Sequence, residues 1–213
     1  MDINKTMQFM NGLATTRRYS NSRLIQDENL LEHTGFVVVF SKMIGNEITS
    51  VQSGTKLDMC TLLSKAAIHD IEEVITGDIP RPTKYFSEEV RAAFEIVEKD
   101  GVNSILDDIE LHRTSHEVIY NEWLHAKGGL EGSIIKLTDM AAVVYKMHSE
   151  VTLMGNLSML HTCRNVVEYI RGAREHLEMM WADEPESLKY LMGICDQLNE
   201  LAVVATSRGN GVL

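Results

Sequence analysis

Apolar residues recur at intervals of three or four along almost the whole of this 213-residue chain. That spacing places them on one face of an α-helix, whereas the strict alternation typical of a half-buried strand is nearly absent. The pattern predicts helices over residues 3–14, 29–44, 56–76, 87–99, 133–154, 160–181 and 185–207, with a short helical piece and one more helix between residues 100 and 131. We therefore expect an all-α protein.

The chain has no linker, internal repeat or low-complexity tract that would divide it. A length of 213 residues is enough for one sizeable core, and 44% hydrophobic with 24% charged residues is typical of a globular protein. We expect residues 1–213 to form a single helical bundle, which the C-terminal helices, about residues 158–207, complete.

The charge balance excludes one class of partner. With 31 acidic against 20 basic residues the net charge is −11, so we expect no binding to duplex nucleic acid. A small anionic substrate is still compatible, because a few basic side chains and a metal ion can reverse the sign inside a pocket.

The chain shows no sign of a membrane or secretory location. It has no signal-peptide pattern and no run of about 18 apolar residues, so we expect no membrane partner. Cys60, Cys163 and Cys195 are widely spaced in apolar helical segments, which favours reduced core thiols and a cytoplasmic location.

The stretch of residues 68–80 concentrates groups that can bind a metal or carry a proton. On a continuous helix His69 and Glu73 lie one turn apart on one face, with Asp70 beside them, and Gly77 predicts the end of that helix. The flanking residues are apolar and would bury the cluster, and a buried charge needs a partner. A divalent cation is a natural partner, because it binds both imidazole nitrogen and carboxylate oxygen.

Two further candidates, His33 and Asp139, interrupt other apolar helices. A histidine in such a helix is more often a hydrogen-bonded core residue than a ligand, unless it faces His69. A carboxylate there needs a partner, and a salt bridge to arginine or lysine is as reasonable as a metal.

Two loops carry basic and aromatic side chains. Residues 15–23 hold three arginines around Tyr19; they form either a solvated turn or a site for phosphate and base, because arginine matches phosphate oxygens and tyrosine can stack. Pro80 and Pro82 would stiffen the loop of residues 78–86 and bring Lys84 near the site, although an exposed lysine is the simpler interpretation.

Taken in order, His33, the His69–Asp70 doublet and Asp139 resemble the HD-domain metal-dependent phosphohydrolases. The sequence around them is similar to the bacterial HD-domain 5'-deoxynucleotidases, which are related to viral dATP triphosphohydrolases. The similarity covers about residues 15–150 and is carried by four segments, residues 29–33, 69–80, 82–86 and 136–139. It implies a single HD-domain helical bundle.

The resemblance also implies roles for individual residues. His33, His69, Asp70 and Asp139 would hold one divalent ion of the cobalt, manganese or magnesium type, with a second magnesium ion where the substrate is a polyphosphate. Glu73 and Asp78 would be the catalytic acids. Arg18 and Lys84 would contact the phosphate, and Tyr19, which stands where bacterial members are expected to have tryptophan, would contact the sugar and base.

The implied activity is the hydrolysis of deoxynucleoside 5'-monophosphates to deoxynucleoside and phosphate by a homo-oligomer. One alternative is a deoxynucleoside triphosphohydrolase that releases triphosphate, for which the candidates for extra phosphate contacts are Arg17, Arg23, Lys65 and Arg81. A noncatalytic module that senses a nucleotide is a third hypothesis, and the complete set of ligand and acid residues speaks against it.

Overall fold

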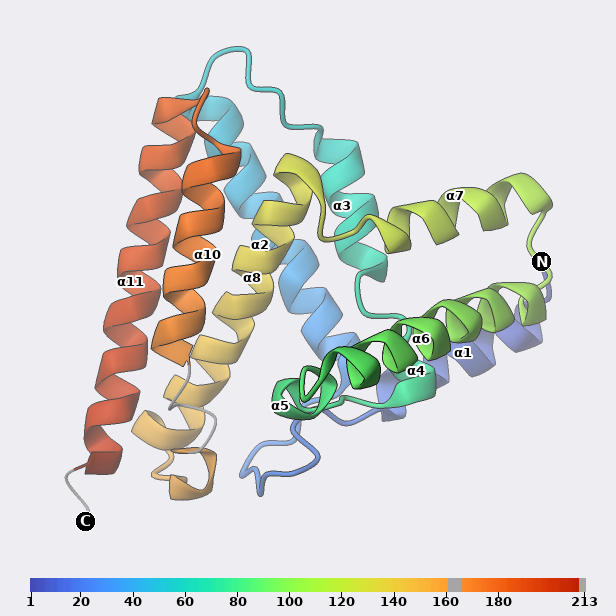
Figure 1. Cartoon of the computed structure of the whole chain (residues 1–213), viewed down its shortest axis with the longest axis horizontal. Helices are drawn as coiled ribbons and strands as arrows, with labels where there is room; N and C mark the ends of the chain where they lie inside the picture. The colour runs from blue at the N-terminus through green and yellow to red at the C-terminus, as the bar shows by residue number, and fades with distance from the viewer. Residues whose placement is uncertain (161–165, 211–213) are drawn as a thin grey trace.

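The computed structural model describes residues 1–160 and 166–210, with side chains up to residue 207. Within these ranges the secondary structure is helical, apart from one isolated antiparallel bridge between Arg17 and Asn29. The prediction of an all-α bundle is confirmed. Figure 1 shows two groups of helices that meet near the middle of the molecule.

The first group encloses the larger of two hydrophobic cores. Its members are α2 (Leu30–Val51), α3 (Met59–Ile68), α8 (Gly129–Met147), α10 (Val166–Met180) and α11 (Pro185–Asn210). The helices α3 and α8 pack on α2, and α10 packs on α8 and α11. Leu62, Ile134, Leu177 and Trp181 are among the side chains that fill this core.

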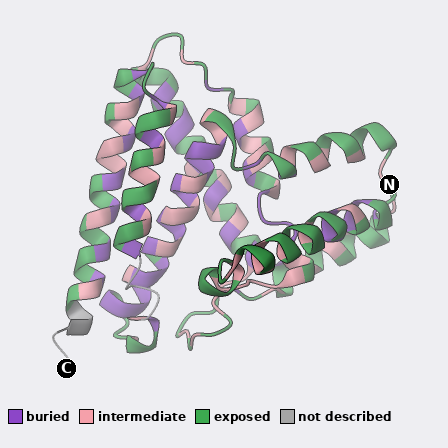
Figure 2. Ribbon diagram, viewed as in Figure 1, coloured by how far each residue is buried: buried purple, intermediate pink, exposed green. Residues whose placement is uncertain are grey.

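The second group encloses a smaller core. Its members are α1 (Ile3–Thr15), α4 (Glu73–Thr76), α5 (Arg81–Lys84), α6 (Glu88–Asp108) and α7 (Arg113–Leu124). Ile71, Val102, Leu106 and Trp123 are buried here, and Phe9 from α1 packs beside them. Figure 2 shows that much of α6 and α7 is exposed, whereas α8 in the first group is largely buried.

Residues 56–76 do not form the single helix that the sequence predicts. Helix α3 ends at Ile68 and α4 begins at Glu73, with a turn between them. His69 supports the break, because its Nδ1 lies 2.8 Å from the carbonyl oxygen of Ala66. In a continuing helix that oxygen would accept a hydrogen bond from the backbone N–H of Asp70. The turn carries the chain from the larger core to the smaller one.

The predicted loop over residues 45–55 is wrong in its first part, because α2 continues to Val51. Gly45 is buried, and a Cβ there would stand 2.4 Å from the sulfur of Met59. The glycine allows α3 to approach α2 closely instead of ending the helix. Ile48 is fully buried in the extra turn and adds to the core.

Helix α6 likewise runs past its predicted end at residue 99 and stops at Asp108. Its Gly101 is buried, and a Cβ there would lie 3.3 Å from the side chain of Ile75. A glycine can therefore mark a close helix contact as well as a helix end. Ser87 caps α6 as predicted and accepts a hydrogen bond from the backbone N–H of Val90 at 3.3 Å.

The helix predicted over residues 133–154 is α8, which begins earlier and ends at Met147. A π-helical segment η1 (His148–Leu153) and a short 3-10 helix η2 (Leu157–Met159) follow it. The last two predicted helices are confirmed as α10 and α11. Residues 161–165, which belong to the first of these predicted helices, lie outside the described residues.

The apolar faces of α1 and α2 are partly exposed, since Met7 is 62% exposed and Val39 and Met43 are each 61% exposed. The prediction of a core thiol at Cys60 is wrong, because Cys60 is exposed. Cys195 is buried as predicted, and Cys163 lies outside the described residues. In the described part of the chain, no helix has the length and apolar character needed to span a membrane.

Glu150 is a buried carboxylate in η1 that ties the loop before α2 to the end of α8. It accepts hydrogen bonds from the backbone N–H groups of Ile25 and Gln26, at 2.9 Å each, and from the side-chain amide of Asn156 at 2.6 Å. Lys146 Nζ lies 3.3 Å away. Burial alone would raise the pKa of Glu150, but these donors outweigh it and lower the pKa.

Replacing this carboxylate should therefore destabilise the fold. Glu150→Gln is expected to lower the free energy of unfolding by about 2 to 4 kcal/mol near neutral pH, because an amide turns one acceptor into a donor that faces N–H groups. The pKa of Glu150 is lower in the folded state than in the unfolded state. Its carboxylate therefore stabilises the fold above the unfolded pKa of about 4.3. The difference in free energy of unfolding between Glu150→Gln and the original protein should narrow as the pH falls below that value.

Urea denaturation at about pH 7 and about pH 3.5 measures both effects. The exposed Glu168→Gln on α10 is the control and should stay within about 0.5 kcal/mol of the original protein. A difference that persists unchanged in acid would contradict the role given to the Glu150 carboxylate.

Candidate metal centre

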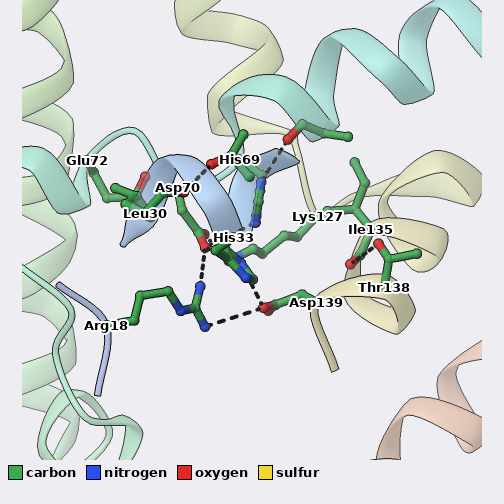
Figure 3. Close-up of polar contacts among 12 residues, drawn as sticks. Arg18, Leu30, His33, His69, Asp70, Glu72, Lys127, Ile135, Thr138 and Asp139 are labelled. Atoms are coloured by element: carbon green, nitrogen blue, oxygen red, sulfur yellow. Dashed lines mark hydrogen bonds and ion pairs between the residues drawn. The ribbon is translucent and has the colours of Figure 1, made fainter. Parts of the chain in front are cut away.

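Four side chains from three separate stretches of the sequence meet between the two groups of helices (Figure 3). His33 lies on α2, His69 and Asp70 lie on the turn after α3, and Asp139 lies on α8. One nitrogen or oxygen atom of each lies within 4.8 Å of the others. His33 Nε2 is 3.4 Å from Asp139 Oδ1 and 3.5 Å from Asp70 Oδ2, and His69 Nε2 is 3.1 Å from Asp70 Oδ2. We call this group the His/Asp cluster.

Local contacts fix the helices that carry the cluster. Helix α2 begins with a capping box, in which the Asn29 side chain accepts from the N–H of Glu32 at 2.9 Å and the Glu32 side chain accepts from the N–H of Asn29 at 3.0 Å. The cluster histidine of α2 follows directly. The buried hydroxyls of Ser41 and Thr138 lie 3.0 Å apart and join α2 to α8 beside the cluster aspartate.

The two imidazole rings are suited to bind a cation. The contact of His69 Nδ1 with the Ala66 carbonyl places the proton on that nitrogen, so Nε2 faces the cluster as an acceptor. Among the described residues, His69 Nε2 and both ring nitrogens of His33 are buried and find no hydrogen-bond partner. Such atoms are rare in proteins, and unpartnered imidazole nitrogens beside two carboxylates are what a divalent ion with nitrogen and oxygen ligands requires.

Two basic side chains balance the carboxylates of the cluster. Arg18 lies 3.9 Å from Asp70 and 4.0 Å from Asp139, and its Nε is 3.4 Å from Glu28. Lys127 Nζ is 2.9 Å from Asp70 Oδ1. Burial would raise the pKa of Asp70, but His69 and Lys127 hold that pKa well below its usual range. Burial would likewise raise the pKa of Asp139, but the interaction with His33 outweighs burial and lowers it.

Two glutamates follow the doublet. Glu72 is buried and accepts a hydrogen bond from Trp123 Nε1 at 2.6 Å, and burial together with the charge of Asp70 raises its pKa to about 7. Glu73 begins α4 instead of continuing the helix before it, and its Oε2 is buried without a hydrogen-bond partner. Burial first, and then the charge of Asp70, raises the pKa of Glu73 well above its usual range. A carboxyl of this kind can carry a proton at neutral pH.

Asp78 contacts the arginine-rich loop. Its Oδ2 accepts a hydrogen bond from the backbone N–H of Tyr19 at 2.5 Å, and Tyr19 has a φ of 56°, in the left-handed region that a tyrosine seldom adopts. The Arg18 guanidinium lies 5.5 Å from the centre of the Tyr19 ring, whose buried hydroxyl has no hydrogen-bond partner. Asp78 therefore holds the backbone at Tyr19, next to Arg18, in the loop that the family resemblance implies for the substrate site.

A cavity of about 370 Å³, the His69 cavity, opens beside His69 and Glu72. Its walls combine Tyr85 and Trp123 with several lysines and glutamates, and Lys84 lies among them, 2.6 Å from Glu98. This cavity is within the usual size range of small-molecule sites, whereas a second cavity beside the other cluster histidine measures about 170 Å³. A third, of about 480 Å³, lies between α10 and α11 and contains no residue of the cluster.

The link between α7 and α8 holds Lys127 in place. Ala126 is 2% exposed, and a Cβ on Gly132 of α8 would stand 2.3 Å from the carbonyl carbon of Lys127. Only glycine lets the backbone of the link approach α8 this closely. Lys65 adds a hydrogen bond to the carbonyl oxygen of Gly128 at 3.4 Å.

The structure brings together all four predicted metal ligands, but it also shows contacts that the sequence analysis missed. No role was expected for Lys127, Glu72 or Trp123, which lie within hydrogen-bond distance of the cluster or of one another. The one available signal for Lys127 is its position directly before the two glycines that begin the helix of Asp139. That signal is weak, because surface links are commonly rich in lysine and glycine.

The fold is that of an HD-domain phosphohydrolase. A solved structure described as an HD-domain phosphohydrolase from Listeria innocua superposes with a TM-score of 0.67 at 21% identity, covering 98% of this chain and 100% of that one. A protein from Pyrococcus horikoshii superposes with a TM-score of 0.63 at 18% identity, covering 94% and 99%. The buried His/Asp cluster is consistent with the divalent metal site of such domains.

Sequence comparison narrows the class to a family. The profile of the family described as 5'-deoxynucleotidase YfbR-like matches residues 5–181. A 5'-deoxynucleotidase of Shewanella oneidensis is 27% identical over 172 residues, which are 79% of this chain and 80% of the relative. The 5'-deoxynucleotidase YfbR of Escherichia coli is 27% identical over 168 residues, covering 78% and 82%. The chain belongs to the YfbR-like 5'-deoxynucleotidase family.

The close packing at Gly132 can be tested directly. Gly132→Ala is expected to lower the free energy of unfolding by about 1 to 3 kcal/mol, because the new methyl group would overlap the Lys127 backbone. Gly172→Ala on α10 is the matched control: nothing lies within 4 Å of a Cβ there, so it should be neutral or stabilise by up to about 1 kcal/mol. Urea denaturation compares the two, and equal effects would show that the link is not tightly packed.

Proposed function

We propose that this protein hydrolyses the 5' phosphate ester of deoxynucleoside monophosphates to deoxynucleoside and inorganic phosphate. The observation that carries the proposal is the convergence of two imidazoles and two carboxylates in a buried cluster, in a chain of the YfbR-like family. The relatives are named for this activity. A nucleotide-sensing module without catalysis would not require a complete set of ligands and acids.

The ligands of one divalent ion would be His33, His69, Asp70 and Asp139. Cobalt, manganese and magnesium are all compatible with two nitrogen and two oxygen ligands. Such an ion supplies Lewis acidity, which neutralises charge on phosphoryl oxygens and makes water more acidic at neutral pH.

The residues around the cluster would bind the phosphate and move protons. Arg18 would contact the phosphoryl oxygens, and Lys84 in the His69 cavity would add a second basic contact. Water forms the new bond to phosphorus as the bond to the 5' oxygen breaks. Glu73 would donate a proton to that departing oxygen, in keeping with its raised pKa, and would take up the proton that the attacking water loses, which restores its carboxyl. Asp78 would orient the loop of Arg18 and take part in positioning the water.

The nucleoside would occupy the His69 cavity, whose volume of about 370 Å³ suits a small molecule. The aromatic rings of Tyr85 and Trp123 on its walls suit a base or sugar. Tyr19, held beside Arg18, would contribute to recognition of the sugar and base from the arginine-rich loop.

The charges of the cavity favour a monophosphate over a triphosphate. Its three lysines face three glutamates, of which Glu72, with its pKa raised to about 7, loses part of its charge near neutral pH. The walls therefore carry little excess positive charge for a polyphosphate tail and a second magnesium ion. Arg17 instead pairs with Asp27 at 3.3 Å, and the Arg81 guanidinium lies over the rings of Tyr85 and Tyr169. A homo-oligomeric state stays a prediction from the resemblance, and a cytoplasmic location stays a prediction from the cysteine pattern.

A substrate panel tests the reaction. With manganese, cobalt or magnesium present, the protein should release inorganic phosphate from deoxynucleoside 5'-monophosphates, and EDTA should abolish the activity until metal is added back. The four deoxynucleoside triphosphates serve as the comparison. Release of triphosphate from them, with no turnover of the monophosphates, would replace the proposed reaction with its alternative, and activity indifferent to EDTA would exclude metal-dependent hydrolysis.

A second experiment tests the role of Glu73. Glu73→Gln should lower kcat by about 100- to 10,000-fold, because an amide cannot transfer the proton. Manganese binding should be retained, since Glu73 is not among the proposed ligands, and calorimetry measures it. The exposed Glu175→Gln on α10 is the control and should keep full activity. Full turnover by Glu73→Gln would remove this residue from the mechanism.

A further inference from the structure

Lys127 is one of two basic side chains that contact the His/Asp cluster, and it differs from the other in exposure. The Arg18 side chain is 8% exposed, whereas that of Lys127 is 44% exposed and lines the His69 cavity. Figure 3 shows Lys127 extending from the link before α8 toward the cluster. An anion that enters the cavity would meet Lys127 before it meets the buried arginine.

The two cations also differ in their partners. Arg18 contacts Glu28 as well as both cluster carboxylates, so it keeps Glu28 as a partner when the cluster carboxylates bind an ion. Among the described residues, Asp70 is the only carboxylate that forms an ion pair with Lys127. A divalent ion held by Asp70 would compete for the charge of that carboxylate and weaken its attraction for the ammonium.

A phosphate monoester has the negative charge needed to pair with the Lys127 ammonium. It carries about −1.5 to −2 at neutral pH and has several acceptor oxygens, whereas an ammonium group is a compact donor of three hydrogen bonds. The Lys127 ammonium is 2.9 Å from Asp70 Oδ1, and Oδ2 of the same carboxylate lies in the cluster. A phosphoryl group beside the cluster would therefore be within reach of Lys127.

The backbone of Lys127 is fixed independently of that ion pair. The contact with Gly132 and the burial of Ala126 hold the link against α8, so the side chain can exchange one partner for another without a rearrangement of the chain. A preorganised donor of this kind binds at a lower entropic cost than one on a free loop.

We propose that Lys127 binds the phosphoryl group of the substrate, and of the inorganic phosphate product, beside the His/Asp cluster where Lys127 lines the His69 cavity. This rests on the proposed function, because it assumes a phosphate monoester at the cluster. It adds a substrate-binding residue to the arginine and lysine implied by the family resemblance.

Isothermal titration calorimetry on the full chain tests the proposal with two probes, manganese chloride alone and inorganic phosphate at saturating manganese. Lys127→Met keeps the length of the side chain and removes the charge. It should weaken phosphate binding by about 10- to 100-fold, the usual worth of a hydrogen bond to a charged group. Its affinity for manganese alone should be unchanged or higher, because a competing cation has been removed from Asp70.

Lys189→Met is the control, since Lys189 is exposed on α11 and does not line the cavity. It should bind both probes as the original protein does. Lys127→Gln provides a second uncharged variant, and thermal unfolding of each variant establishes that it is folded.

Two results would overturn the proposal. Phosphate binding by Lys127→Met equal to that of the original protein would remove Lys127 from the substrate site. A parallel loss of manganese and phosphate affinity would show that Lys127 acts only by positioning Asp70. Failure of the original protein to bind manganese or to hydrolyse monophosphates would instead count against the proposed function, so the two failures are distinguishable.

Discussion

The structure depends on the electrostatic problem posed by Asp70 and Asp139, two ionised carboxylates that face each other between the two cores. Neither can be buried at acceptable cost without a compensating charge. Arg18 and Lys127 at the edges supply part of that charge, and the two imidazole rings place ring nitrogens beside the carboxylates. A divalent cation at the centre would supply the rest of the positive charge and would bind those nitrogens, which is why the site suits such an ion.

The turn after α3 makes this arrangement compatible with the fold. If residues 56–76 were one straight helix, it would not lead from the larger core to the smaller one. The break at His69 lets Ile71 enter the smaller core and places Glu72 within hydrogen-bond distance of Trp123. The His69–Asp70 doublet therefore lies at the junction of the two cores, where it is held by packing from both sides.

The sequence predicts the class of fold and the four cluster residues, because helical periodicity and the HD-type pattern are local properties of the chain. It fails where the decisive contact lies elsewhere. Gly45 and Gly101 look like helix ends but are buried under Met59 and Ile75, and the break after Ile68 has no glycine or proline to announce it. Lys127 was missed for the same reason: its partner Asp70 is 57 residues away in the sequence.

The most direct test of the central claim is a crystal structure of the protein soaked with manganese and measured at a wavelength where the ion scatters anomalously. The account predicts one strong anomalous peak per chain at about 2.0 to 2.3 Å from a nitrogen of each cluster histidine and an oxygen of each cluster aspartate. A structure without a peak at the cluster, or with His33 or Asp139 turned away from the ion, would contradict it.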